Sequence, residues 1–516
     1  VIVPVPDRVE GLKEHRISLN GTWKFTLNPP EAFWKNAVDL SDWNDIKVPG
    51  EPWMQGLEIK RDIEYPYKKQ IKIPDDFKGQ RILLRFDGVY SAGRVWVNGN
   101  FAGEHYGGFT SWNLDITEFV VPGEPAWITV GITDLADDLS FASGYASRYY
   151  TDDFDHFIGG ILRDVTLFAV PEVCVASLHY VTDLDNQYKN TDFEIKLELV
   201  NNGNEDKEYF LRYSLLDPLG SDKTVWRHET STGKIKPSEK NIETHETKIK
   251  NPLLWDAEHP NLYTLKVDLT VDGKLVEVLS RKVGFREIEL KDGRVLVNGK
   301  EVKLRGGCRH SVHPLTGRSD MPEFDEKDVL LYKEANINYI RTSHYPCTER
   351  FLEMCDKYGI YVEEEMAIVW LDHHAAKGKL DDRHSDPEYL PYFIRQISEA
   401  LERDKSHPSV IIWSLGNENC KWGENFEKER DYARQEDPTR LLKTGHNHYS
   451  EGWNTDEHLD LDSYHYPLWN SNFNKDGKPF LFDEYVHVIC YYKSNFNAEW
   501  DPNVRNFWGE SIKKFW

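Results

Sequence analysis

Two glutamates stand where short apolar runs of this sequence end, and their chemistry depends on whether they face each other. Glu418 ends the run VIIWSLGNE, and Glu484 ends the run FLFDE. Cleavage of a glycosidic bond with retention needs one carboxylic acid to protonate the leaving oxygen. It also needs a second carboxylate at the anomeric carbon, about 5–5.5 Å from the first. One such glutamate alone would more often be a salt-bridged rim residue, so its neighbours decide the interpretation.

Further polar residues follow or precede these two glutamates. Asn417 directly precedes Glu418 and offers an amide to a sugar hydroxyl, while Tyr485 and His487 follow Glu484 as polar lining. Other predicted strand ends carry Arg305, Arg309, His310, Arg341, His344, Tyr464 and Tyr466. His310 and His344 each close an apolar strand, so we expect them in a pocket. A lone histidine is more often structural, which is our interpretation of His373, His374 and His384.

Two groups of acidic residues are harder to place. Strand alternation predicts that Asp483, next to Glu484, points away from the pocket and is structural. Glu363 and Glu365 alternate with Glu364 along a predicted strand, so this pair and Glu364 lie on opposite faces of it. One of these two faces is expected to look toward the centre of the fold, and the roles of the glutamates stay open.

The elements that must position these residues begin near residue 288, where strands alternate with amphipathic helices. This pattern is typical of βα units around a parallel sheet. The expected strands are Val302–His310, Asn338–His344, Tyr361–Glu365, Val410–Glu418, Leu441–His446, Leu461–Tyr466 and Phe480–Tyr485. Seven such strands predict a (β/α)₈ TIM barrel that lacks its last strand, since the chain ends at SIKKFW. Barrel enzymes place their chemistry at the C-terminal ends of the strands, where the two glutamates stand.

Two β-rich segments precede the barrel. From about residue 17 to 172, runs such as RILLRFDGV alternate polar and apolar positions, which predicts an antiparallel β-sandwich with a tight turn at Asn98-Gly99. The runs between about 173 and 287 alternate likewise, at a length that suits an immunoglobulin-like sandwich. The predicted fold is therefore multidomain β plus α/β, with domains at 1–172, 173–287 and 288–516.

Composition excludes several functional classes. The formal net charge of −24 disfavours nucleic acid and anionic lipid, whereas a neutral substrate suits it. No apolar stretch reaches the roughly 20 residues that a membrane span needs. Six scattered cysteines do not form a disulfide scaffold or CxxC spacing. The chain opens VIVPVPDRVEG like a trimmed product, which leaves the compartment unknown but favours a periplasmic or secreted location over a cytoplasmic one.

The sequence strongly resembles glycoside hydrolase family 2, which groups β-galactosidases, β-glucuronidases and β-mannosidases. The resemblance rests on five motifs in order: LRGGCRHSVHPLTG (304–317), INYIRTSHYP (337–346), FLEMCDKYGIYVEEE (351–365), HPSVIIWSLGNEN (407–419) and FDEYVHV (482–488). Residues 94–117 and 159–171 resemble the family's sugar-binding jelly-roll domain, which an immunoglobulin-like domain follows. The resemblance therefore implies a jelly-roll sandwich, an immunoglobulin-like sandwich and a barrel.

The resemblance also implies roles. Glu418 matches the general acid/base and Glu484 the nucleophile of a double displacement, in which like-charge repulsion from Glu484 would keep Glu418 protonated. Positions that line the sugar subsite are matched by Arg341, His344, Asn417, Tyr466, His487 and His310.

The E-Y-x-H pattern at Glu484–His487 is most similar to the β-galactosidases. The expected activity is removal of terminal non-reducing β-linked sugars from oligosaccharides or glycosides, with a β-glucuronidase or β-mannosidase as alternatives. A non-catalytic carbohydrate-binding protein is the alternative from another class. Val369 and Leu371 stand where large β-galactosidases carry a magnesium-binding E-x-H. We therefore expect no metal and no cofactor. A homo-oligomer stays open, because no motif marks an interface.

Overall fold

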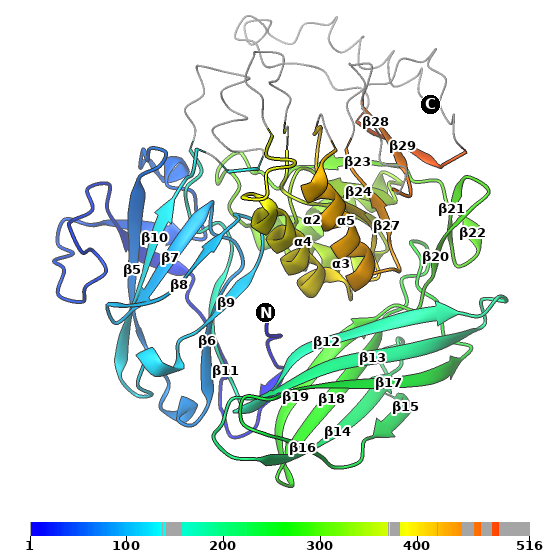
Figure 1. The fold of residues 1–516 in the computed structure, drawn as a ribbon, viewed down its shortest axis with the longest axis horizontal. Helices are drawn as coiled ribbons and strands as arrows, with labels where there is room; N and C mark the ends of the chain where they lie inside the picture. The colour runs from blue at the N-terminus through cyan, green and yellow to red at the C-terminus, as the bar shows by residue number, and fades with distance from the viewer. Residues whose placement is uncertain are drawn as a thin grey trace, which may run out of the picture.

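The computed structural model describes residues 2–136, 138–140, 157–221, 223–369, 371, 382–419, 422–445, 459–465 and 477–484. Two β-rich parts and a parallel-stranded part with helices follow one another along the chain (Figure 1). The two β-rich parts both lie against the parallel-stranded part, and the short N-terminal segment runs between them.

The first β-rich part is a sandwich of two antiparallel sheets. The six-stranded sheet has the order β4-β3-β5-β10-β7-β8, and the four-stranded sheet has the order β2-β11-β6-β9. Their core holds aromatic residues such as Trp23, Phe25, Tyr67 and Phe86, all at most 1% exposed. The strands are β2 Arg16–Ser18, β3 Gly21–Phe25, β4 Asn44–Val48, β5 Glu64–Lys72, β6 Arg81–Phe86, β7 Ala92–Val97, β8 Asn100–Tyr106, β9 Trp112–Asp115, β10 Pro125–Thr133 and β11 Val165–Val170.

The second β-rich part is also a two-sheet sandwich, and strand alternation explains its core. In β13, every second residue from Phe193 to Leu199 is buried, while the residues between them are exposed or half-buried. The sheets have the orders β12-β13-β17 and β1-β19-β18-β14-β15, with β16 beside β14. The strands are β1 Arg8–Val9, β12 Val173–Leu184, β13 Asn190–Asn201, β14 Lys207–Leu216, β15 Thr224–Glu229, β16 Gly233–Ile235, β17 Lys240–Lys250, β18 Tyr263–Val271 and β19 Lys274–Val283.

The third part is built on parallel strands, as the alternating pattern predicted. A small antiparallel sheet, β20 Ile288–Lys291, β21 Arg294–Val297 and β22 Lys300–Glu301, leads into it. Five parallel strands then form one sheet in chain order, and two more pair in parallel. These strands are β23 Gly306–Arg309, β24 Tyr339–Thr342, β25 Tyr361–Glu365, β26 Val410–Ser414, β27 Leu441–Lys443, β28 Asp462–His465 and β29 Phe480–Glu484.

Each described strand of this part lies within one of the seven predicted ranges. Asp460 N donates to the carbonyl oxygen of Leu442 at 3.0 Å, and the Cys308 thiol lies 3.4 Å from the carbonyl oxygen of Asp483. The β28–β29 pair is thus joined to the five-stranded sheet at both ends. The predicted lack of an eighth strand stays a prediction, because residues 485–516 lie outside the described residues.

Four described helices cover the parallel strands on their outer side (Figure 1). Their bounds are α2 Pro322–Glu334, α3 Glu349–Tyr358, α4 Leu390–Asp404 and α5 Glu424–Glu436. Local sequence sets the ends of α3, where the Thr348 side chain accepts a hydrogen bond from Phe351 N and Gly359 adopts φ 77°. A Cβ at Gly359 would lie 2.4 Å from the carbonyl oxygen of Ala257, so only glycine fits this predicted helix stop.

The second sandwich is anchored to the barrel by a buried tryptophan. Trp255 is fully buried, and its indole Nε1 donates to the carbonyl oxygen of Asp356 at 2.9 Å. Its ring packs edge-on against Tyr361 of β25, 5.8 Å between ring centres. The anchor thus connects a loop of the sandwich directly to a strand of the barrel.

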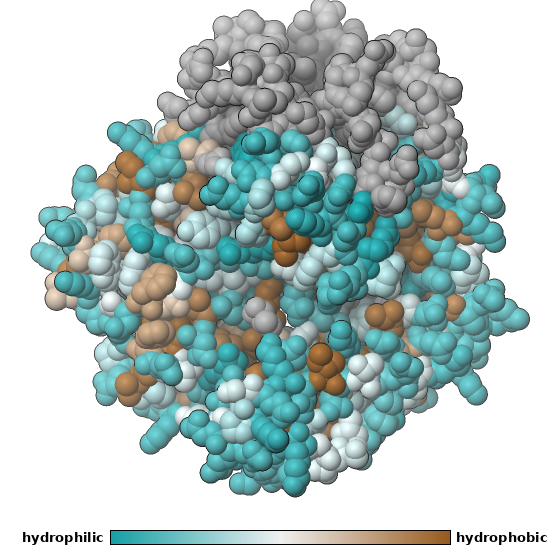
Figure 2. Space-filling view, viewed as in Figure 1, coloured by the Kyte–Doolittle hydropathy of each residue, from teal (hydrophilic) through white to brown (hydrophobic). Residues whose placement is uncertain are grey.

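The described surface on the face in Figure 2 is mostly hydrophilic, with small scattered hydrophobic groups. Among the described residues, no helix combines the length and the apolar character that crossing a membrane requires.

Trp255→Ala should lower the free energy of unfolding by about 3–5 kcal/mol, because it leaves a cavity and an unpaired carbonyl. Chemical denaturation followed by circular dichroism measures the loss. Leu219→Ala is the control, since Leu219 is 75% exposed, and its effect should stay within about 0.5 kcal/mol. A loss below about 1 kcal/mol for Trp255→Ala would mean that this anchor does not stabilise the chain.

Candidate active site

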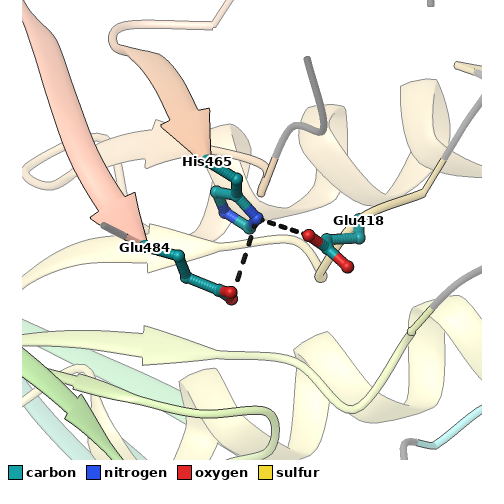
Figure 3. A group of neighbouring side chains, drawn as sticks. All are labelled: Glu418, His465 and Glu484. Carbon is teal, nitrogen blue, oxygen red and sulfur yellow. Dashed lines mark hydrogen bonds and ion pairs between the residues drawn. The ribbon is translucent and has the colours of Figure 1, made fainter. Parts of the chain in front are cut away.

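Glu418 and Glu484 meet at one end of the parallel strands, with His465 between them (Figure 3). Glu418 follows β26, His465 ends β28 and Glu484 ends β29. His465 Nδ1 lies 2.9 Å from Glu418 Oε1 and 3.7 Å from Glu484 Oε1. One ligand atom from each of the three residues lies within 4.8 Å of the others. The structure therefore brings together the two glutamates that the sequence singled out.

The turn before Glu418 is fixed by close backbone contacts. Asn417 N donates to the carbonyl oxygen of Ile368 at 2.9 Å, and Gly445 N donates to that of Gly416 at 2.7 Å. Gly416 has φ 149°, and a Cβ there would lie 2.5 Å from Ile368 O. Glu418 itself has φ 46°, a left-handed conformation that costs a non-glycine residue on the order of 1 kcal/mol. These contacts hold Glu418 in an unfavourable backbone conformation.

Arg341 of β24 organises the polar groups around Glu484. It is 1% exposed, and its Nη1 donates to Glu484 Oε1 at 2.9 Å. Its Nε donates to Glu365 Oε2 at 2.7 Å, and its Nη2 donates to Asn417 Oδ1 at 2.6 Å. The Asn417 amide, which the sequence analysis offers to a sugar hydroxyl, therefore binds Arg341 through its oxygen in this structure.

Glu365 links Arg341 to the predicted pocket histidines. Its Oε1 lies 2.7 Å from His344 Nδ1, and its Oε2 accepts from Ser414 at 2.8 Å. Burial raises the pKa of Glu365, but Arg341 and the hydrogen bond from His344 outweigh it and lower this pKa to about 2. The exposed His310 packs edge-on against His344, 5.1 Å between ring centres. His344 Nε2 in turn lies 3.9 Å from Glu484 Oε1.

A second buried cation, Lys443 of β27, lies among the inward-facing acidic residues. It forms ion pairs with Asp483 and, at 2.6 Å, with Glu363. Asp483 also accepts from Ser463 at 2.5 Å and lies 3.7 Å from His465 Nε2. Lys443 lowers the pKa of Asp483 against the opposing effect of burial. The structural role of Asp483 stays a prediction, which its pairing with Lys443 supports.

The predicted direction of Asp483 is wrong, however. Its carboxylate faces the same interior as Glu484, because the pairing of β28 with β29 shifts register between Ser463 and His465. Such a shift breaks the two-residue alternation on which the prediction rested.

The three consecutive glutamates of β25 divide between two sides, which resolves the roles that the sequence left open. Glu363 and Glu365 face the interior cations, whereas Glu364 lies 3.5 Å from Arg403 of α4. Arg309 is also structural, because it pairs with Asp325 at 2.8 Å. The ion pairs of Glu364 and Arg309 each join a strand to a helix, and they support the packing of helices on strands.

Sequence reasoning missed His465, the residue between the two glutamates. It named Tyr464 and Tyr466, but in β28 it is Ser463 and His465 that are buried. The alternation of that strand was the signal that could have found His465. Lys443 was missed as well, although it is a lysine in a strand that is buried throughout. Tyr466, His487, His373 and His374 lie outside the described residues.

The trio of Glu418, His465 and Glu484 also offers the donor atoms that divalent metals accept. Glu484 is already paired with Arg341 at 2.9 Å, and His465 bridges the two carboxylates. Side chains of the protein thus already pair with both carboxylates. Val369 and Leu371, where large β-galactosidases carry metal ligands, are buried apolar residues.

Three family models match consecutive parts of the chain. Residues 60–171 match the sugar binding domain of glycosyl hydrolases family 2, residues 173–286 match a further model of glycosyl hydrolases family 2, and residues 288–498 match its TIM barrel domain. The predicted order of two sandwich-like domains and a TIM barrel domain is confirmed.

Curated relatives include β-galactosidases. The chain is 31% identical over 509 residues to one from Halalkalibacterium halodurans, covering 92% of the chain and 48% of the relative. It is 32% identical over 539 residues to one from Streptococcus thermophilus, covering 93% and 50%. The chain spans about half the length of these relatives.

Solved structures with the same fold include a β-glucuronidase. Bacteroides uniformis β-glucuronidase 2, covalently bound to cyclophellitol-6-carboxylate aziridine, aligns with a TM-score of 0.76 at 26% identity. The alignment covers 87% of this chain and 55% of that structure.

Lys443→Met should lower the free energy of unfolding by about 3–5 kcal/mol, because it removes the cation that the buried Asp483 and Glu363 share, and only Glu363 keeps a second pair, with Arg341. Adding Asp483→Asn should restore part of the loss. Lys240→Met is the matched control, since Lys240 is 55% exposed and its pair with Glu198 contributes at most about 1 kcal/mol. Urea denaturation measures all three; equal effects of Lys443→Met and Lys240→Met would contradict the interpretation.

Proposed function

Because the chain belongs to glycosyl hydrolase family 2, we propose that it is a retaining exo-β-glycosidase that acts on β-galactosides. Glu484 is the nucleophile and Glu418 the general acid/base of this proposal. One observation carries it: an oxygen of Glu418 and an oxygen of Glu484 lie within 4.8 Å of each other at the ends of two strands. Retaining glycosidases separate their carboxyl groups by about 5–5.5 Å, and inverting ones by about 6.5–9.5 Å. The close pair favours retention.

The surrounding charges suit the two roles. Arg341 donates to Glu484 at 2.9 Å, which orients the carboxylate and favours its ionised, nucleophilic form. Arg341 also binds Asn417, the neighbour of Glu418, so one guanidinium fixes both catalytic segments. Such fixed geometry supplies part of the catalysis, because no reorganisation is needed at the moment of reaction.

In the proposed mechanism, Glu484 attacks the anomeric carbon while Glu418 gives a proton to the departing glycosidic oxygen. A covalent glycosyl-enzyme and a free aglycone alcohol result. Water then attacks the same carbon, Glu418 accepts its proton, and the bond to Glu484 breaks. Two inversions leave the configuration of the sugar unchanged.

The choice of galactose rests on sequence likeness. The curated relatives that are 31–32% identical are β-galactosidases, and the chain carries the E-Y-x-H pattern at Glu484–His487. A β-glucuronidase structure is similar at 26% identity, so β-glucuronides are the second candidate.

A panel of p-nitrophenyl β-glycosides tests the activity and the sugar together. We expect the β-galactoside to be hydrolysed with the highest kcat/KM, and the initial product to keep the β configuration when followed by NMR. A preference for the β-glucuronide or β-mannoside would change the assigned sugar but not the proposed type of reaction. If no glycoside of the panel is hydrolysed while sugar binding is intact, the result would favour a non-catalytic carbohydrate-binding protein.

Glu484→Gln should lower kcat by on the order of 10⁴-fold or more while sugar binding persists, because the nucleophile is lost. Steady-state kinetics on the best substrate and calorimetric titration with the free sugar measure the two effects. Glu334→Gln is the matched control, an exposed glutamate of α2, and should change kcat less than about twofold. A near-normal rate for Glu484→Gln would overturn the assignment of the nucleophile.

A further inference from the structure

His465 is fully buried and lies between the two carboxylates of the site (Figure 3). Its Nδ1 is within hydrogen-bond distance of Glu418 Oε1, at 2.9 Å, and 3.7 Å from Glu484 Oε1. The other ring nitrogen, Nε2, lies 3.7 Å from Asp483 Oδ2. A buried imidazole with carboxylates near both nitrogens is well placed to carry a proton.

The charged groups around His465 come from several strands. Glu418 follows β26, and Asp483 and Glu484 belong to β29. In the described part of the chain, the cations of this cluster are Arg341 of β24 and Lys443 of β27, and each is already paired with acidic residues. The other inward acids are Glu363 and Glu365 of β25, which pair with Lys443 and Arg341. Negative groups thus outnumber positive ones around the imidazole.

This balance favours the imidazolium. Burial lowers the pKa of His465, but the charge of Glu484, together with Asp483 and Glu418, outweighs burial and the repulsion from Arg341, and raises this pKa to about 9. Near neutral pH, the ring therefore carries a proton that faces Glu418 Oε1.

We propose that His465 stores the proton that Glu418 delivers to the leaving oxygen, so that the two residues act as one acid. This inference rests on the proposed function, since it assigns a source to the proton of the general acid. His465 acts through Glu418 and is a positioning residue rather than a group that touches the substrate.

The proton and the charges balance over one cycle. In the resting site, His465 is protonated and both glutamates are ionised, so the proton on His465 replaces the protonated Glu418 that the family resemblance implied. As the Glu484 carboxylate forms its bond to the anomeric carbon, the Nδ1 proton passes to Glu418 and on to the glycosidic oxygen, whose bond to carbon breaks. Neutral His465, ionised Glu418 and an ester at Glu484 remain. Water then supplies a proton through Glu418 back to His465, and its oxygen replaces Glu484 on the sugar.

The charge of Glu484 explains the timing. This charge is the largest of the effects that hold the proton on His465, and the attack on the sugar removes it. The imidazolium therefore becomes more acidic at the step that consumes a proton. Restoring the Glu484 carboxylate at the end of the cycle makes the imidazole basic again.

Replacing His465 by Gln tests the proposal, because Gln can donate a hydrogen bond but cannot store a proton. We expect kcat/KM for an alkyl β-glycoside to fall by about 10²-fold or more, since its leaving group needs the acid. The 2,4-dinitrophenyl β-glycoside, whose leaving group needs no proton, should lose less than about tenfold. The basic limb of the kcat/KM profile should also move to lower pH. His259→Gln, the same change at an exposed histidine, should leave both substrates unaffected.

Equal losses on the two substrates, with an unmoved pH profile, would show that His465 is merely structural and would overturn the proposal. A wild-type chain that hydrolyses no glycoside of the panel would instead overturn the proposed function. The two failures are therefore distinguishable.

A second measurement does not depend on turnover or on the folding of the His465 variant. NMR titration of the histidine rings should find His465 protonated up to about pH 9 in the wild type. In Glu484→Gln, its midpoint should move to lower pH by about one unit or more, as expected for the loss of a nearby charge. A ring that is neutral at pH 7 in the wild type, or a midpoint unmoved by Glu484→Gln, would contradict proton storage.

Discussion

The guanidinium of Arg341 is buried among the barrel strands, and a buried charge is tolerated only when acidic and polar groups surround it. Its hydrogen bonds fix the places of Glu365, Glu484 and Asn417, which come from three different strand ends. Any rearrangement of one of these segments would leave part of the guanidinium unpaired. The geometry of this end of the barrel thus follows from the need to neutralise one cation.

Strand β25 shows how this requirement connects the site to the rest of the fold. Its three consecutive glutamates are all buried, yet only Glu363 and Glu365 reach the interior cations. Glu364 points outward to Arg403 of α4, so the same strand fixes a helix on one side and the charged interior on the other. Trp255 packs against this strand as well, through Tyr361. The sandwich, the helix layer and the site therefore share β25 as a common support.

Regular alternation made much of this predictable from sequence. The strand Tyr361–Glu365 was expected at the same residues as observed. The end of α3 was predicted at Gly359, where only glycine fits. Glu418 and Glu484 were singled out because apolar runs end at them, which is a local property of the chain.

Prediction failed where regular geometry ends. The register shift beside Ser463 turns Asp483 inward, and no local pattern marks that shift. His465 was overlooked because β28 is short. An error of one residue in the assumed alternation exchanges the residues that face the interior with those that face outward. The ion pairs of Lys443 depend on residues that lie 80 and 40 positions away in the sequence, and only the closed arrangement of strands brings them together.

The left-handed backbone of Glu418 has a consequence for how this position can evolve. Glycine or asparagine would suit φ 46° better than glutamate does, but neither can exchange a proton with a glycoside. With the acid/base role that we propose for Glu418, a stable backbone and turnover make opposite demands on this one residue. Replacing Glu418 by glycine or asparagine would relieve this backbone conformation but remove the proposed acid/base, so the position combines a gain in stability with a loss of the proposed activity.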